Sequence, residues 1–284
     1  LAMRLPSPLP QAATVIADPL CLHEERQLAQ SLTRLITLTE MGADCLRARM
    51  RLPHERVSVI AHGNLAIAQS PMPALEPLRL LYFGFIYRGK GIEDLLDALA
   101  LCVQQQPNLA STLRLTLAGG SAPEMAFTPG TSYLEQLRSR IAVQGLQGML
   151  DWQLDIAADA IAPLIQAHHV MVLPYQESKK LGLLGAMRGT SGALSWAAAC
   201  GRGAITSDAR AFAEEVSYGN GALYPQGNVN ELATQLLTLA KHPERTAQWA
   251  EEAQKLGHER QWLNTAERFK HLFNTLCKEV QHVA

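Results

Sequence analysis

The sequence lacks the cysteine pattern of secreted or metal-binding domains. Its five cysteines are scattered along the chain, are odd in number and form no C-x-x-C pair. This use of cysteine excludes a paired-cysteine motif and is typical of a reducing compartment, where thiols serve as small core residues.

The sequence also lacks an excess of positive or negative charge, and it lacks long apolar segments. The chain has 25 basic and 26 acidic residues, a net charge of -1, which predicts no bulk attraction to nucleic acid. No apolar run approaches the ~20 residues that a membrane-spanning helix needs, and no signal peptide is recognisable. These absences predict a cytoplasmic protein, with peripheral association with the inner face of the membrane left open.

Signatures of metal or nucleophilic chemistry are absent as well. None of the nine histidines belongs to a cluster with metal-ligand spacing, and G-x-S-x-G and Walker motifs are not found. His168 and His169 are adjacent, so in a strand they point to opposite sides and do not chelate one ion. We therefore expect no metal site. His62, at the end of a strand and before Gly63, is either a polar contact or a structural histidine.

What is present is an alternation of short apolar runs and helical patterns. In 284 residues, 48% apolar and 18% charged, the sequence predicts strands over 56–62, 78–84, 113–119, 169–175 and 203–208. Apolar residues at helical spacing over 92–103 and 232–240 lie between or after them. This alternation predicts an α/β fold with a parallel sheet and flanking helices, in which ligands bind at the carboxyl ends of the strands.

The two ends of the chain differ from this pattern. Residues 1 to about 55 predict a helix, a short strand over 34–39 and a second helix, too little to close an independent α/β domain. A proline-rich linker follows over 68–77. Residues 259–283 predict one long amphipathic helix. We expect three parts, a short first part over 1–64, an α/β domain over 65–258 and a helix over 259–284.

Three segments follow predicted strands and carry residues suited to an anion. The loop 84–91 contains Arg88 and Lys90 among glycines, Gly119-Gly120 ends another strand, and "GTSG" (189–192) opens a helix. Small first-turn residues leave backbone N–H groups open to a phosphate, although a capped buried helix has the same appearance. A solvated basic loop and a tight glycine turn are the alternatives for the other two segments.

The stretch between Tyr175 and that helix is rich in charge. Glu177 is suited to accept hydrogen bonds from a sugar hydroxyl, and Lys179, Lys180 and Arg188 to attract phosphate. A flexible surface loop explains Lys179 and Lys180 better than it explains Glu177.

Six segments in order resemble the carboxyl-terminal half of the group 1 (family 4) glycosyltransferases. They are "VSVIAHGN", "LLYFGFIYRGKGIEDLLDAL", "LRLTLAGG", "AIAPLIQAHHVMVLPY", "TSGALSWAAACGRGAITSD" and "FAEEVSYGNGALYPQGNVNELATQLLTL", within 55–255. The resemblance implies a GT-B architecture and a hexosyltransferase-type, metal-independent enzyme. Its partners would be a UDP- or GDP-linked sugar and a glycan or lipid-linked acceptor, in bacterial polysaccharide or glycoconjugate synthesis, with retention and no cofactor.

Residue by residue, the resemblance makes Lys90 the diphosphate-binding lysine and Glu177 a donor-sugar contact, and these two are the predicted catalytic residues. Glu214 or Glu215 matches a further glutamate of the family. The predicted donor-binding residues are Gly84, Arg88, Lys90, Gly119, Gly120, Tyr175, Thr190, Ser191, Gly192 and Glu215.

The chain departs from the family at two positions. Phe85 stands where a basic residue is expected, with Arg88 as the displaced candidate, and Trp196 stands where a ribose-binding glutamate is expected. The resemblance makes residues 1–64 a remnant of the acceptor-side domain and linker, and residues 65–258 the Rossmann-like nucleotide-sugar-binding domain. It makes residues 259–284 a long helix that crosses back. The short amino-terminal part predicts a piece of a longer enzyme, inactive on its own. A non-catalytic nucleotide-sugar-binding partner is the main alternative function, and a GT-B epimerase is a weaker one.

Overall fold

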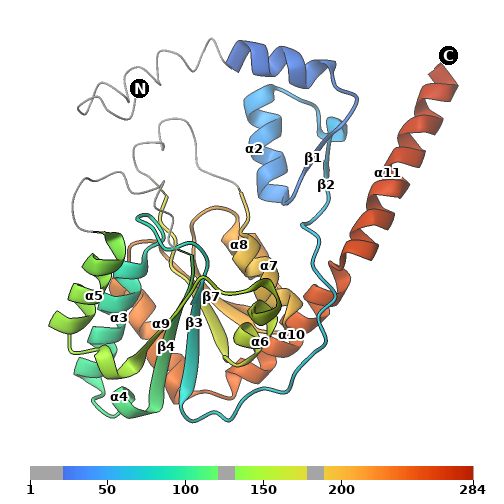
Figure 1. Ribbon diagram of the computed structural model, residues 1–284. Coiled ribbons are helices and arrows are strands. Elements are labelled where there is room, and N and C mark those ends of the chain that lie inside the picture. The colour runs from blue at the N-terminus through green and yellow to red at the C-terminus, as the bar shows by residue number, and fades with distance from the viewer. Residues whose placement is uncertain (1–21, 121–131, 178–188, 284) are drawn as a thin grey trace.

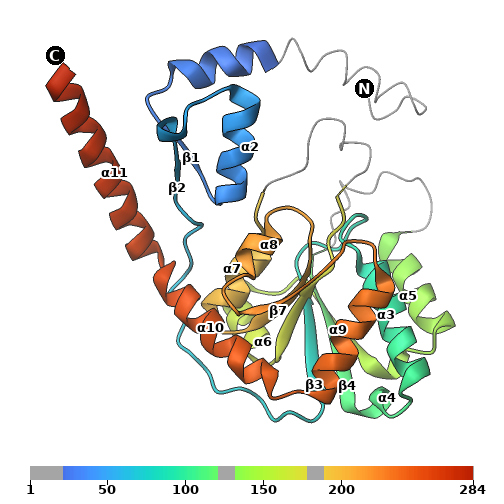
Figure 2. The same ribbon diagram turned by 180° about the vertical axis from the view of Figure 1, so that it is seen from behind.

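The protein consists of a large α/β unit and a small amino-terminal unit (Figure 1). The computed structural model describes residues 22–120, 132–177 and 189–283. The predicted phosphate-attracting residues Lys179, Lys180 and Arg188 lie outside the described residues. The small unit lies on the side of the large sheet where its strands end, and α11 extends beside it (Figures 1 and 2).

The large unit contains a parallel six-stranded sheet, as the alternating pattern predicts. Numbered along the chain, its strands lie in the spatial order 3-2-1-4-5-6, which is the Rossmann order. In that spatial order the strands are β5 (Leu150–Leu154), β4 (Leu113–Gly119), β3 (Leu78–Phe83), β6 (Val170–Leu173), β7 (Gly203–Ser207) and β8 (Gly221–Tyr224).

Two strands of this sheet, β5 and β8, were not among the predicted strands. Both lie at sheet edges, where residues are only partly buried, and their runs are too short and too polar to stand out. The predicted strand over 56–62 exists but lies elsewhere: β2 (Val57–Val59) pairs with β1 (Leu35–Thr37) in a separate two-stranded sheet of the small unit.

Helices cover both faces of the large sheet. On one face α3 contacts α5 and α9, and on the other α7 contacts α6 and α10 (Figures 1 and 2). The helices are α3 (Ile92–Gln105), α4 (Leu109–Thr112), α5 (Tyr133–Val143), α6 (Ile161–Gln166), α7 (Gly192–Ala199), α8 (Phe212–Glu215), α9 (Val229–Lys241), α10 (Arg245–Glu259) and α11 (Trp262–Val283).

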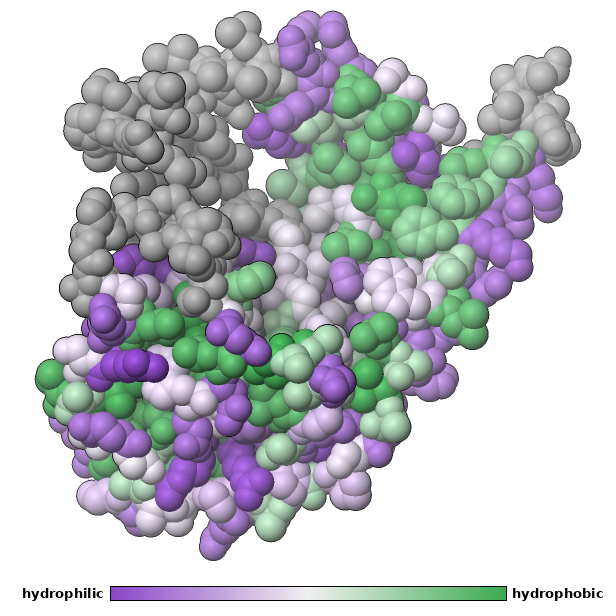
Figure 3. All heavy atoms as spheres, in the orientation of Figure 1, coloured by the Kyte–Doolittle hydropathy of each residue, from purple (hydrophilic) through white to green (hydrophobic). Residues whose placement is uncertain are grey.

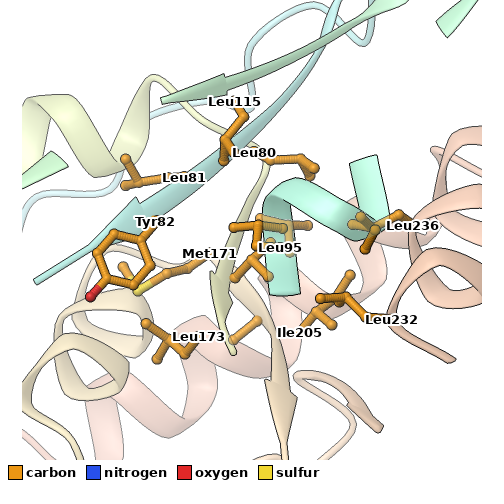
Figure 4. Close-up of a cluster of buried hydrophobic side chains, with 14 of the residues drawn as sticks. Leu80, Leu81, Tyr82, Leu95, Leu115, Met171, Leu173, Ile205, Leu232 and Leu236 are labelled. Atoms are coloured by element: carbon orange, nitrogen blue, oxygen red, sulfur yellow. The ribbon is translucent and has the colours of Figure 1, made fainter. Parts of the chain in front are cut away.

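The core of the large unit forms between the sheet and these helices. Leu80 of β3, Leu95 of α3 and Leu232 and Leu236 of α9 are buried and point toward one another (Figure 4). Leu95, Leu232 and Leu236 carry the helical spacing that the sequence shows over 92–103 and 232–240. Their burial orients α3, so that the loop before it is held at the end of β3.

The small unit has its own hydrophobic cluster. Helical residues 22–31, β1, α2 (Glu40–Met50) and β2 surround Ala29, Ala43, Met50 and Val57. Hydrophobic side chains gather over this unit and the adjoining part of α11 (Figure 3). Trp262 and Leu263, at the start of α11, are 51% and 75% exposed.

The helix expected over 259–283 begins later than predicted. The chain turns between α10 and α11, where Trp262 N–H donates to Asn64 O at 2.9 Å and Asn64 N–H donates to Arg260 O. The segment around Asn64 and the carboxyl-terminal segment therefore meet at this turn, which the amphipathic pattern alone does not reveal.

Candidate functional site

The candidate site lies where β3 and β6 end, at the point where the strand order reverses. Doubly wound sheets bind ligands in the crevice at such a switch point. The loop after β3 contains Lys90, and the segment after β6 contains Tyr175. The two segments are joined by a hydrogen bond in which Gln176 N–H donates to Gly89 O at 3.1 Å.

Gly91 allows this close approach. It has φ +67° and caps α3, and a Cβ at this position would lie 1.7 Å from Pro174 O. A residue with a side chain would both strain the backbone and push the β6 segment away. The approach of the two loops therefore depends on glycine here.

Lys90 packs against aromatic rings. Its Nζ lies 3.6 Å from the centroid of the Tyr175 ring and 5.2 Å from that of Tyr87. Desolvation, with the positive charge of Arg210, lowers the pKa of Lys90 to about 8. Among the described residues no carboxylate pairs with Lys90, and its ammonium group lies against the Tyr175 and Tyr87 rings instead.

The amino-terminal end of α7 faces the same ring. Ser191 is the N-cap residue; its side chain accepts no capping hydrogen bond, and its Oγ lies 3.4 Å from Tyr175 Oη. Gly192 is exposed, and a Cβ there would meet open space. The first turn of α7 thus presents backbone N–H groups and the positive end of the helix dipole to the site.

Thr190 and Glu177 are connected to the site through Arg210, a residue that the sequence reasoning missed. Arg210 Nη1 donates to Thr190 O at 3.3 Å, and Arg210 N–H donates to Glu177 Oε1 at 2.7 Å. The guanidinium carbon lies 5.5 Å from the centroid of the Tyr175 ring. The sequence does contain a signal for Arg210. It is a cation three residues after β7, and β7 also ends at this edge of the sheet.

The predicted glycines Gly84, Gly119 and Gly120 lie at the carboxyl ends of β3 and β4. A Cβ on Gly84 would lie 3.4 Å from Tyr175 Oη, and one on Gly119 (φ +141°) would lie 1.9 Å from Gly84 O. Gly120 lies near Phe85 and Asp155, at the end of β5. Gly84 and Gly119 therefore let the ends of β3 and β4 come together beneath the site.

Arg88 turns away from Lys90. Its guanidinium lies 3.9 Å from a Glu93 carboxylate oxygen, donates to Gln136 and stacks over the Tyr133 ring at 5.5 Å. The structure thus does not bring Arg88 to the Lys90 side of the loop.

Glu215 also lies apart from the cluster. Its carboxylate accepts a hydrogen bond from Arg260 Nη1 at 2.6 Å, and both side chains are less than 10% exposed. The neighbouring Glu214 reaches the small unit instead, where it accepts hydrogen bonds from the N–H groups of Glu40 and Met41 at 2.8 and 2.9 Å. The two glutamates hold elements together in this structure.

Two cavities adjoin α7. One, of about 380 Å³, lies between the small unit and Gly189-Thr190. The other, of about 170 Å³, lies at the turn between the units and is lined by Trp196, Trp262, His62 and Asn64. His62 contacts the Trp262 ring at 5.6 Å between centroids and lies 3.2 Å from Ser195 Oγ.

Residues 22–120, 132–177 and 189–283 contain no group of three or more His, Cys, Asp or Glu side chains that could hold a metal ion. Over the same ranges, no helix has both the length and the hydropathy to cross a membrane.

The strand order defines the class of the protein, a Rossmann-like α/β protein whose strand order reverses between β3 and β6. The profile described as glycosyl transferases group 1 matches residues 77–242, more than half of the chain, and the chain belongs to this family. No curated protein sequence matches the chain with significance.

Solved structures of GT-B glycosyltransferases share this fold. HepE from Anabaena in complex with UDP has a TM-score of 0.71 at 18% identity over 96% of this chain and 70% of its own. HepE with UDP and glucose has a TM-score of 0.68 at 18% identity, covering 89% of this chain and 66% of its own. Sucrose-phosphate synthase from Thermosynechococcus elongatus has a TM-score of 0.72 at 20% identity, covering 92% and 63%. The chain thus has the GT-B fold and spans about two thirds of the length of these proteins.

Proposed function

We propose that the protein transfers a sugar from a nucleotide-sugar donor to an acceptor hydroxyl, with retention of the anomeric configuration. The observation that carries this proposal is the meeting of Lys90 and the first turn of α7 at the Tyr175 ring, 3.6 Å from Lys90 Nζ. A cation and a helix N-terminus converge there on one edge of a sheet that belongs to a glycosyltransferase family.

In the proposed reaction the bond between the anomeric carbon and the diphosphate oxygen breaks, and the diphosphate leaves with the electron pair. The acceptor oxygen bonds to the anomeric carbon, and its proton passes to the departing phosphate oxygen or to water. Negative charge develops on the leaving group, so Lys90 and the N–H groups of α7 lower the barrier by stabilising that charge.

The proposal names candidate donors and an entrance for the acceptor. HepE binds UDP and UDP-glucose in its solved complexes, which makes UDP-linked hexoses the first donors to test, with GDP-linked sugars next. The cavity between the small unit and Gly189-Thr190 is the proposed entrance for a glycan or lipid-linked acceptor.

The alternative is a non-catalytic donor-binding partner of another transferase. Trp196 favours it, because this position carries an indole that lines an apolar cavity where the family resemblance expects a carboxylate for ribose. Loss of a ribose contact weakens binding of the donor but leaves the contacts to its phosphates in place.

A panel of UDP- and GDP-sugars tests both functions on the full chain. A bound donor at about 100 times its dissociation constant adds about 2.7 kcal/mol of stability, which a thermal shift detects. Release of the nucleoside diphosphate, with acceptor or with water, then separates the enzyme from the binding partner. Absence of stabilisation by every nucleotide sugar and by free UDP and GDP would contradict both functions.

A further inference from the structure

The diphosphate of the proposed donor needs more positive charge than Lys90 provides. The family resemblance expects a basic residue directly after Gly84, but Phe85 stands there and is 63% exposed. Arg88, the nearest candidate in sequence, is engaged with Glu93 and Tyr133. The loop after β3 therefore brings one cation to the Tyr175 ring.

Arg210 brings a second cation to the same ring from another loop. It lies between β7 and α8, 120 positions after Lys90 in the chain. Lys90 Nζ is 3.6 Å and the Arg210 guanidinium carbon 5.5 Å from the Tyr175 centroid. Their repulsion contributes to the lowered pKa of Lys90. The positive charge of Arg210 disfavours the charged form of Lys90, and an anion that contacts both cations removes this penalty.

The Arg210 guanidinium uses few of its N–H donors in contacts with the described residues. Within the described residues, the side chain of Arg210 donates a hydrogen bond to Thr190 O and forms no ion pair with a carboxylate. A guanidinium has five N–H donors arranged for bidentate contact with phosphate oxygens. Toward the described residues, most of these donors are therefore unused.

The backbone of Arg210 is fixed by the loops around it. Its φ of +59° is left-handed, a conformation that costs free energy for a residue with a side chain. The hydrogen bond from its N–H to Glu177 Oε1, at 2.7 Å, holds it there. Ala211 N–H also donates to Gly189 O, which ties the same loop to the start of α7.

We propose that Arg210 is the second diphosphate-binding cation of the protein and takes the role of the basic residue missing at Phe85. Its guanidinium and Lys90 Nζ contact the diphosphate together with the first turn of α7. Glu177 is then a positioning residue, because its carboxylate holds the backbone that carries the guanidinium. This inference rests on the proposed function.

The test compares variants of the full chain by calorimetry with UDP, GDP and inorganic pyrophosphate. Arg210→Ala is expected to weaken binding of pyrophosphate and of the nucleoside diphosphate by about 10- to 100-fold, the loss of a charge-assisted hydrogen bond. Arg210→Lys should restore part of the affinity. Arg88→Ala is the matched control, an arginine of the neighbouring loop that faces away, and should bind like the wild type.

A thermal melt of each variant separates binding from folding. Arg210→Gly removes the cation and suits the left-handed backbone, so it is the variant to use if Arg210→Ala does not fold. If Lys90→Ala weakens UDP binding while Arg210→Ala and Arg210→Gly bind like Arg88→Ala, the inference is wrong and the proposed function stands. If the wild type binds no nucleoside diphosphate or nucleotide sugar, the proposed function fails instead.

Discussion

Arg260 and Glu215 form a buried ion pair, with Arg260 Nη1 2.6 Å from Glu215 Oε2 and both side chains less than 10% exposed. The pair joins α8 to the turn between α10 and α11. Arg260 also lies over the Tyr218 ring, at 5.3 Å from its centroid. A glutamate that resembles a donor contact in sequence therefore connects α8 to the turn that precedes α11.

Loss of this pair should unfold the protein more easily without affecting ligand binding. Glu215→Gln leaves the charge of Arg260 buried without a partner, which costs about 3–5 kcal/mol. Urea unfolding measures the loss, and calorimetry with UDP should show wild-type affinity. Glu251→Gln is the control, because Glu251 pairs with Lys255 on the exposed surface. If the folded Glu215→Gln variant binds UDP more weakly than the wild type, Glu215 contributes to the binding site and the prediction is wrong.

Binding of a nucleoside diphosphate should weaken as the pH rises from 7 to 9. The pKa of Lys90 is lowered to about 8 by desolvation and by Arg210, so the free protein loses this charge over that range. The anion favours the charged lysine, so binding takes up a proton near pH 8. Burial raises the pKa of Tyr175, which leaves Tyr175 neutral throughout.

Calorimetry in buffers of different ionisation enthalpy measures this proton uptake. Lys90→Arg keeps the charge at every pH, and its affinity should be flat between pH 7 and 9. An unchanged decline in Lys90→Arg would assign the pH dependence to another group.

Gly91 and Gly89 form a matched pair for testing the contact between the loops. Gly91→Ala places a Cβ 1.7 Å from Pro174 O at φ +67°, whereas Gly89→Ala, at φ +91°, meets no atom within 4 Å. Both substitutions pay the left-handed cost of about 1–2 kcal/mol, and Gly91→Ala adds the clash with the backbone. We expect a lower melting temperature and weaker UDP binding for Gly91→Ala than for Gly89→Ala. Equal effects would show that the close approach to Pro174 is unimportant.

The contact of Glu214 with α2 should determine how firmly the small unit rests on the large one. Glu214→Ala removes both hydrogen bonds to the N–H groups of Glu40 and Met41, at a local cost of about 1 kcal/mol, the usual value of a helix cap. Hydrogen exchange of residues 39–50 should become faster while that of β3 and β4 stays the same. Thr39→Ala is the comparison, because Thr39 caps α2 from within its own unit. Unchanged exchange in Glu214→Ala would mean that other contacts seat the small unit.

Local patterns were sufficient to predict most of the large unit. Apolar runs such as 78–83 and 113–119 and the helical spacing of Leu95, Leu232 and Leu236 identify elements because burial acts on each segment separately. The α/β class, the Gly-rich loop with Lys90 and the small first turn of α7 follow from the sequence in the same way. β5, β8 and the partner of β2 do not, because edge strands are weakly patterned and pairing is chosen by the whole sheet.

Local sequence patterns identify most segments of the large unit and several of the residues suited to a phosphate, whereas the assembled fold selects the side chains that lie together. It brings Arg210 to the ring that Lys90 covers, turns Arg88 toward Glu93 and pairs Glu215 with Arg260. Contacts between residues far apart in the chain depend on where the strand order reverses and on which loops glycine lets approach. These are properties of the assembled sheet, and no single segment contains them.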